Sequence, residues 1–200
     1  QGSRLTIQDL TTGYANSSRD VIDGLNLIVP PRCKVGVVGT TGCGKSSLLL
    51  CLLRMIEPRC GKIEINGIDT QTIGLKALRK AFGLVSQEPI LFSGTLRDNL
   101  DPFKEFTDDQ IWEALKMVCT ADEIKKVGAL EFVLKEEGNN VSLVQKQRLC
   151  IARMVLKRPG MLLLDEAASA MDPRTQEVLQ RAIRETFADC TVIATAHHLE

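Results

Sequence analysis

The chain has 200 residues, and its 25 basic and 25 acidic side chains give a formal net charge of zero. This length suits one domain, or one domain with a lobe, that can bury a sizeable core. The balanced charge excludes a strong field toward nucleic acid or anionic lipid, so we expect no nucleic-acid partner. Seven cysteines without a C-x-x-C pair favour free thiols in a reducing cytosol over a disulfide frame or a zinc site.

The first part of the chain predicts mostly strands. Asn66-Gly67 separates two short apolar, alternating stretches, which is a strong hairpin signal. The longest apolar run near the middle, residues 48–53, stops at Arg54 and is too short to span a bilayer. Residues 1–3 look like the remnant of a cleavable tag, so we expect a piece of a longer protein. We expect strands at residues 4–10, 25–29, 34–38, 62–65 and 83–86, and helices at 46–53 and 75–81.

The pattern becomes helical from about residue 88. Asp108 and Asp109 are residue types that cap helices, and they precede a helical pattern. Apolar strand signals return in the last quarter of the chain. We expect helices at residues 108–117, 121–126, 145–156 and 174–187, and strands at 161–164 and 191–194. The sequence therefore predicts a helical block, about residues 88–157, inserted into an α/β core.

A phosphate-binding loop follows the expected strand at residues 34–38. The loop matches G-x-x-x-x-G-K-[ST] at every fixed position. Lys45 would reach the β- and γ-phosphates, and the Ser46 hydroxyl would bind Mg²⁺; the alternative is a chance glycine-rich turn. We expect a nucleoside triphosphate to contact Gly39, Thr40, Thr41, Gly42, Cys43, Gly44, Lys45, Ser46 and Ser47.

Two carboxylates end the apolar run of residues 161–164. All-apolar strands are typical of the middle of a parallel sheet, and ligands bind at the carboxyl ends of such strands. Asp165 would hold the Mg²⁺ shell beside the phosphate loop, and Glu166 would act as general base or position the attacking water. The alternative is that these two residues begin a surface turn.

With these motifs the chain resembles the nucleotide-binding domains of ABC transporters over essentially all of its length. The resemblance implies a phosphate-loop NTPase core with a mixed sheet, an N-terminal antiparallel β subdomain and an inserted helical subdomain. It implies one ATP-binding domain at residues 4–200, cut short at its C-terminal end. Residues 86–103 resemble the C subfamily, the multidrug-resistance-associated proteins, and residues 187–193 resemble its second nucleotide-binding domain.

The resemblance also implies roles for residues that carry no signal alone. Gln87 would contact Mg²⁺ and the attacking water, and residues 169–172 resemble the loop that follows the catalytic glutamate. His197 would touch the γ-phosphate as the switch histidine; an exposed or satisfied histidine is the alternative. Tyr14 would stack on adenine, or else be a packing residue near a strand end.

The family signature Leu-Ser-Gly-Gly-Gln is altered in this chain. The aligned residues are Val141, Ser142, Leu143, Val144 and Gln145, so both glycines are replaced. In the family this segment caps a helix and presents the serine hydroxyl and glycine N–H groups to the partner domain's nucleotide. A valine would crowd the phosphate, and a left-handed backbone would be costly for it.

These observations together predict an ATP-hydrolysing domain on the cytoplasmic face of a membrane. Its partners would be transmembrane domains and a second nucleotide-binding domain with an intact signature. One alternative is an ATP-gated switch that does not hydrolyse, against which Glu166 and His197 argue. Another is a soluble family member that acts in translation or DNA repair, against which the C-subfamily run and the neutral charge argue.

Overall fold

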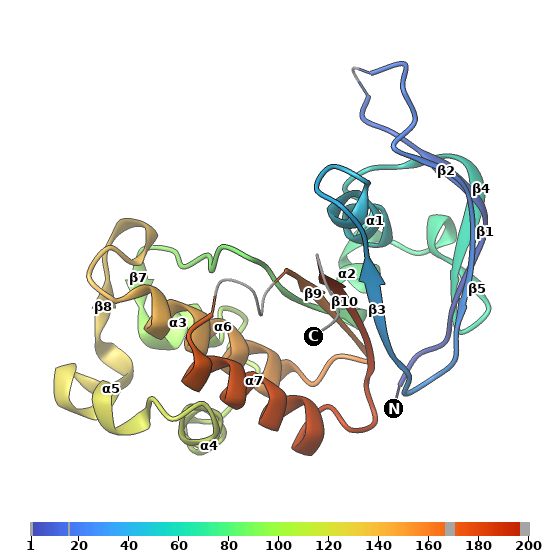
Figure 1. Cartoon of the computed structure of the whole chain (residues 1–200). Coiled ribbons are helices and arrows are strands. Elements are labelled where there is room, and N and C mark those ends of the chain that lie inside the picture. The colour runs from blue at the N-terminus through green and yellow to red at the C-terminus, as the bar shows by residue number, and fades with distance from the viewer. Residues whose placement is uncertain (1, 16, 167–170, 197–200) are drawn as a thin grey trace. The chain divides into compact units, whose positions relative to one another are not determined.

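The computed structural model describes residues 2–15, 17–166 and 171–196 (Figure 1). The chain divides into two compact units. The first unit holds residues 1–84, 159–166 and 189–200, and the second holds residues 85–158 and 167–188.

The first unit contains an antiparallel sheet with the strand order β2-β1-β4-β5. The expected hairpin is confirmed, since Ile65 pairs with Ile68 across Asn66 and Gly67. Both turn residues have positive φ, 52° and 79°, as an Asn-Gly hairpin turn requires. The bounds are β1 Leu5–Thr12, β2 Ile22–Val29, β4 Pro58–Ile65 and β5 Ile68–Asp69.

The same unit contains a second sheet with the strand order β3-β10-β9-β6. Strand β10 pairs in parallel with both β3 and β9, so the carboxyl ends of these three strands meet at one edge. The four apolar residues of β9 are all buried, as expected for an interior strand. The bounds are β3 Lys34–Val38, β6 Phe82–Val85, β9 Met161–Asp165 and β10 Thr191–Ala196.

The core of the first unit is centred on helix α1, Lys45–Leu52. Leu49 and Leu52 are buried in one cluster with strand residues from both sheets. The cluster includes Leu5 and Ile7 of β1, Ile63 of β4, Leu163 of β9 and Ile193 of β10. Two short helical segments, η1 Thr70–Thr72 and α2 Leu75–Ala81, lead into β6. The loop that precedes α1 is therefore anchored by the main core of its unit.

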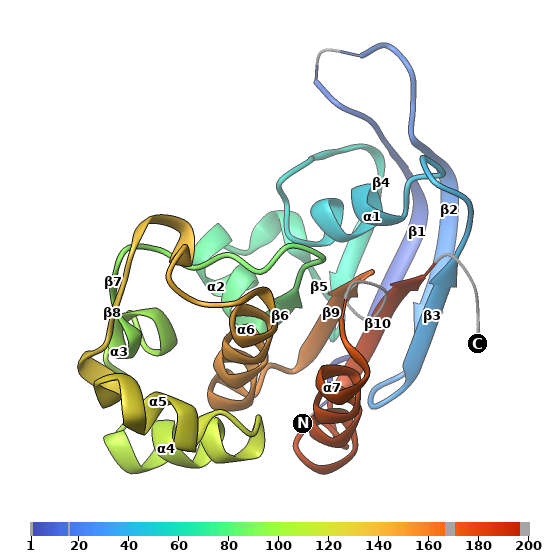
Figure 2. The ribbon, with the colours of Figure 1, turned by 60° about the vertical axis from the view of Figure 1, so that its left-hand side comes forward.

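The second unit is mostly helical (Figure 2). Its longest helix, α6, packs against α3, α4 and α7, and a short antiparallel pair, β7 and β8, accompanies α3. The helices are α3 Leu96–Leu100, α4 Asp108–Met117, α5 Ala121–Val127, α6 Leu143–Lys157 and α7 Pro173–Glu185. The short elements are β7 Gly94–Thr95, η2 Ala129–Glu131, β8 Val133–Leu134 and η3 Glu136–Gly138. The predicted fold class, with an antiparallel sheet, a parallel sheet and helices, is confirmed.

Helix α4 begins where expected, but its cap is a different residue. Thr107, not Asp108, is the N-cap, because the Thr107 side chain accepts a hydrogen bond from the Gln110 backbone. The Gln110 side chain accepts one from the Thr107 backbone in return, which completes a capping box. Asp108 and Asp109 lie in the first turn, where negative charge favours the helix dipole.

Shortening Leu52 to alanine should destabilise the first unit. Leu52 is 0% exposed in the cluster around α1, so its loss leaves a cavity and should lower the free energy of unfolding by about 2–5 kcal/mol. Leu75→Ala is the control, because Leu75 is 41% exposed and its loss should cost about 1 kcal/mol or less. Chemical denaturation would measure both, and equal losses would show that α1 is not central to the core.

Candidate functional site

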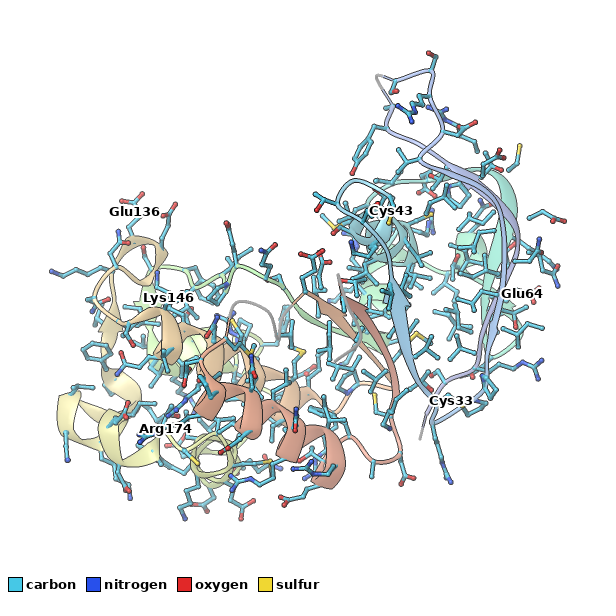
Figure 3. All side chains as sticks on the ribbon, in the orientation of Figure 1. Cys33, Cys43, Glu64, Glu136, Lys146 and Arg174 are labelled. Carbon is cyan, nitrogen blue, oxygen red and sulfur yellow. The ribbon has the colours of Figure 1, made fainter. Side chains whose placement is uncertain are left out.

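The glycine loop joins the end of β3 to the start of α1. Gly42 and Gly44 have φ values of 80° and 100°, a region that residues with side chains rarely adopt. A Cβ at Gly39 would lie 2.5 Å from the Cys43 sulfur. Figure 3 shows Cys43 beside the start of α1. The loop's tight path therefore depends on all three glycines.

The start of α1 faces this loop without a side-chain cap. The N-cap residue is Gly44, which has no side chain that could accept a hydrogen bond from the first turn. N–H groups at a helix start carry partial positive charge, and together with the turns of a glycine loop they favour an anion. The local structure is that of a phosphate cradle.

Lys45 is folded back over the loop. Its Nζ donates to the carbonyl oxygens of Gly39 at 2.7 Å and Thr40 at 3.2 Å. The same Nζ lies 3.4 Å from Glu166 Oε1, and the two side chains are only 4% and 16% exposed. A phosphate chain entering the loop would compete with Glu166 for this ammonium group.

Ser46 and Asp165 meet next to this ion pair. The Ser46 hydroxyl donates to Asp165 Oδ1 at 3.0 Å, although the two residues are 119 positions apart. A hydroxyl and a carboxylate are oxygen ligands of the kind that Mg²⁺ uses, and Mg²⁺ commonly adds substrate phosphates and water rather than a full protein cage. The residues present fit such an ion. The described part of the chain holds no cluster of three or more His, Cys, Asp or Glu side chains placed for a metal.

Tyr14 and an open hollow lie in the same unit as the loop. The Tyr14 hydroxyl is 3.1 Å from Ser47 Oγ, and the residue is 46% exposed. The hollow has a volume of about 480 Å³ and lies between β2, β3 and the loop. Its lining includes Val21, Ile22, Asn26, Val38, Gly44 and Leu48. Sequence reasoning missed Val21 and Ile22, because the strand signal was recognised only from Leu25.

The altered signature forms the start of α6 in the second unit. Ser142 is the N-cap, and a capping box with Gln145 closes it, with bonds of 2.9 and 3.2 Å. Leu143 is 55% exposed. Leu143 and Val144 are not among the residues with positive φ, so left-handed strain does not arise. What these residues add is side-chain bulk at the helix start.

The structure describes only some of the remaining predicted residues. Gln87 follows β6 and is exposed in the second unit. His197, Ser169 and Ala170 lie outside the described residues. Asp172 is the N-cap of α7. Its carboxylate is hydrogen-bonded to Thr175, and the bond to the Thr175 side chain is the main reason why the pKa of Asp172 lies below its usual value.

Residues 22–169 match the family model described as "ABC transporter". The chain belongs to the ABC transporter family. It is 44% identical to "ABC transporter C family member 6" of Arabidopsis thaliana over 98% of its length, and 48% identical to "ATP-binding cassette sub-family C member 4" of Mus musculus over 90%. Those matches span only 13% and 14% of the two relatives. The chain is thus an ATP-binding domain with relatives in the C subfamily.

A solved structure matches almost the whole chain. It is entitled "Structure of a bacterial Atm1-family ABC exporter with ATP bound", with 31% identity and a TM-score of 0.90. The match covers 99% of this chain and 35% of that one. Within the described residues, none of the helices combines the length and the apolar character needed to cross a membrane.

Proposed function

We propose that this chain binds and hydrolyses ATP to power transport by a membrane ABC transporter. The observation that carries the proposal is the meeting of Lys45, Ser46, Asp165 and Glu166 in one unit. These are one cation, one hydroxyl and two carboxylates, at the carboxyl end of parallel strands. The set matches what phosphoryl transfer requires, which is positioning and charge neutralisation.

The side chains have separable roles in this proposal. Lys45 leaves Glu166 and binds the β- and γ-phosphates. Ser46 and Asp165 hold Mg²⁺, which when bound neutralises charge on the phosphate oxygens. Glu166, released from Lys45, orients and deprotonates the attacking water. Residues 39–47 surround the phosphates, and Tyr14 stacks on adenine beside the hollow lined by Val21 and Ile22.

Two further roles rest on the family resemblance. Gln87 contacts Mg²⁺ and the attacking water, and His197 holds the γ-phosphate. We also propose that residues 4–200 form the ATP-binding domain, in the second nucleotide-binding position of its transporter. The likeness of residues 187–193 to that position supports this assignment.

The partners in this proposal follow from the family resemblance. A second ATP-binding domain with an intact signature closes over the site on Lys45. The segment Ser142–Gln145 faces the partner's nucleotide, where Leu143 and Val144 weaken binding. Transmembrane domains complete the protein and place this domain on the cytoplasmic face. The exporter match and the much greater length of the C-subfamily relatives support these partners.

A switch domain that binds ATP without hydrolysis is the second candidate. The altered signature favours it only at the partner's nucleotide, because that is the nucleotide which this segment faces. The presence of Glu166 within 3.4 Å of Lys45 favours hydrolysis at this chain's own site. The two candidates differ in whether Glu166 matters for turnover.

Glu166→Gln in the full-length transporter decides between them. The change removes the charge that activates water and keeps the shape, so turnover should fall about a hundredfold or more. ATP binding should persist or tighten, because Lys45 loses its competing carboxylate. Phosphate release and equilibrium binding would measure the two effects. Lys45→Ala is the control, and it should abolish tight binding. Unchanged turnover in Glu166→Gln would contradict the proposed role.

Restoring the signature should act on the partner's nucleotide. In the full-length transporter, Leu143→Gly with Val144→Gly gives two N–H groups open access to that γ-phosphate. Each hydrogen bond to a charged group contributes about 1.5–3 kcal/mol and each glycine costs about 0.5–1 kcal/mol, so the net gain is about 1 kcal/mol or more and retention should rise about fivefold or more. Site-resolved nucleotide trapping would measure it.

The matched control for this experiment replaces the same two residues with alanine. Neither residue has positive φ, so removal of bulk alone should recover most of the gain. An effect confined to the Lys45 site would contradict the crossed arrangement of signatures.

A further inference from the structure

Thr195 is a buried residue that no motif predicted. It lies on β10, opposite Asp165 of β9, and is 4% exposed. Its Oγ1 is 2.9 Å from Asp165 Oδ1, 3.0 Å from the Glu166 backbone nitrogen and 3.4 Å from the Leu164 carbonyl oxygen. A single hydroxyl therefore contacts both carboxylate-bearing residues of the site.

The direction of these hydrogen bonds follows from the groups involved. The backbone N–H of Glu166 can only donate, so Thr195 Oγ1 accepts from it. The hydroxyl has one proton, and Asp165 Oδ1 is closer and, as a charged acceptor, stronger than the Leu164 carbonyl. Two linked hydrogen bonds thus connect the Glu166 N–H, through the Thr195 hydroxyl, to the Asp165 carboxylate.

These two hydrogen bonds hold the Glu166 backbone and the Asp165 carboxylate in place. Glu166 has a φ of 48°, which is costly for a residue with a side chain unless the surroundings hold it. Asp165 Oδ1 accepts from Thr195 on one side and from Ser46 on the other. The two hydroxyls together set the direction in which the carboxylate faces the loop.

We propose that Thr195 is a positioning residue that orients the Mg²⁺-binding carboxylate of Asp165 and the backbone of Glu166. The inference rests on the proposed function. Loss of the hydroxyl should leave the phosphate loop intact, because Lys45 and the glycines do not contact it. The contribution of Mg²⁺ to ATP binding should then fall, while binding without Mg²⁺ stays the same.

Thr195→Val tests this, since valine has nearly the same shape and no hydroxyl. Titration of the purified chain with a fluorescent ATP analogue, with Mg²⁺ and with EDTA, gives the Mg²⁺-dependent gain in affinity. We expect that gain to fall about tenfold in Thr195→Val, as for a lost bond to a charged group, and to return in Thr195→Ser.

Thr191→Val is the matched control. Thr191 is also buried on β10, where its hydroxyl donates to the Ser3 carbonyl oxygen and accepts from the Arg32 N–H, away from the carboxylates. It should lower thermal stability without changing the Mg²⁺ effect. An unchanged Mg²⁺ gain in Thr195→Val, or an equal loss with and without Mg²⁺, would overturn the inference. Absence of any Mg²⁺ gain in the unmodified chain would instead overturn the proposed function beneath it.

The second unit also carries a groove lined by four arginines, the arginine groove. The groove has a volume of about 800 Å³ and is lined from α5, α6 and α7. Figure 3 labels Arg174 near the start of α7. The charged side chains in the lining are Arg148, Arg174, Arg181, Arg184, Glu123 and Glu177.

Neutral groups hold two of these arginines in place. Arg148 donates to the Thr175 hydroxyl and the Cys119 carbonyl oxygen, both at 3.3 Å. Arg181 donates to the Met117 carbonyl oxygen at 2.5 Å. Across the described residues, no salt bridge joins an arginine of this groove to a carboxylate. The lining holds four arginines and two glutamates, and Asp172 interacts with Arg148, so the formal charge of the lining itself is positive but partly offset.

The spacing along α7 indicates the kind of anion. Arg174, Arg181 and Arg184 recur at helical intervals on one face, over roughly 15 Å of axis. Glu177 interrupts this row between Arg174 and Arg181. A polyanion with a charge at every step, such as nucleic acid, would set a phosphate against Glu177. A polypeptide can separate its carboxylates and avoid this contact.

The geometry points to an acidic polypeptide segment as the occupant of the arginine groove. The probe is a short fluorescein-labelled peptide in which two alanines separate successive glutamates, with anisotropy as the readout; in an extended chain its carboxylates then lie about 10 Å apart, the interval between Arg174 and Arg181 along α7. Arg174→Glu with Arg184→Glu should weaken its binding about tenfold or more, and added salt should weaken binding to the unmodified chain.

Lys116→Glu with Lys126→Glu is the control, because it makes the same change in net charge on exposed lysines outside the groove. This control should weaken binding of the peptide less than the groove variant does, because neither lysine lines the groove. Equal weakening in both variants, no binding of the peptide, or tighter binding of a single-stranded oligonucleotide would overturn the assignment.

Discussion

The parallel register of β3, β10 and β9 is the constraint on which the site depends. It aligns Val38 with Ala196 and Thr195 with Asp165, so the glycine loop and the two carboxylates leave the sheet at one edge. A shift of one residue would turn the strand side chains to the opposite face and separate Lys45 from Glu166. The core around α1 holds this register, because α1 contributes to a cluster that also contains β9 and β10 residues.

The Lys45–Glu166 ion pair links the stability of the site to its chemistry. Two charges with little exposure tolerate burial only when they are paired and hydrogen-bonded, and the Gly39 and Thr40 carbonyl oxygens complete the set for the ammonium group. A triphosphate is a better partner for Lys45 than one carboxylate, because it brings more negative charge. In the proposed function, its arrival would free Glu166 to act on the attacking water.

The start of α6 keeps its helix cap although both glycines of the expected signature are replaced. The capping box needs only the side chains of Ser142 and Gln145, and it forms whatever lies between them. In the proposed function, close approach of a phosphate needs small residues at the two intervening positions, and Leu143 and Val144 are bulky. Helix formation and ligand recognition thus make different demands on neighbouring residues.

The sequence by itself determined the elements whose signals are local: the glycine loop, the Asn66-Gly67 hairpin, the apolar strand before Asp165 and the helical segments. It misplaced the cap of α4, because Thr107 and Asp108 are both good caps and only the backbone path selects between them. Thr195 and the hollow beside β2 were decided by tertiary structure alone. Thr195 is 30 positions from Asp165 and 29 from Glu166 in the sequence, and Ser46 is 119 positions from Asp165. Strand pairing, rather than a local sequence pattern, therefore brings these groups together.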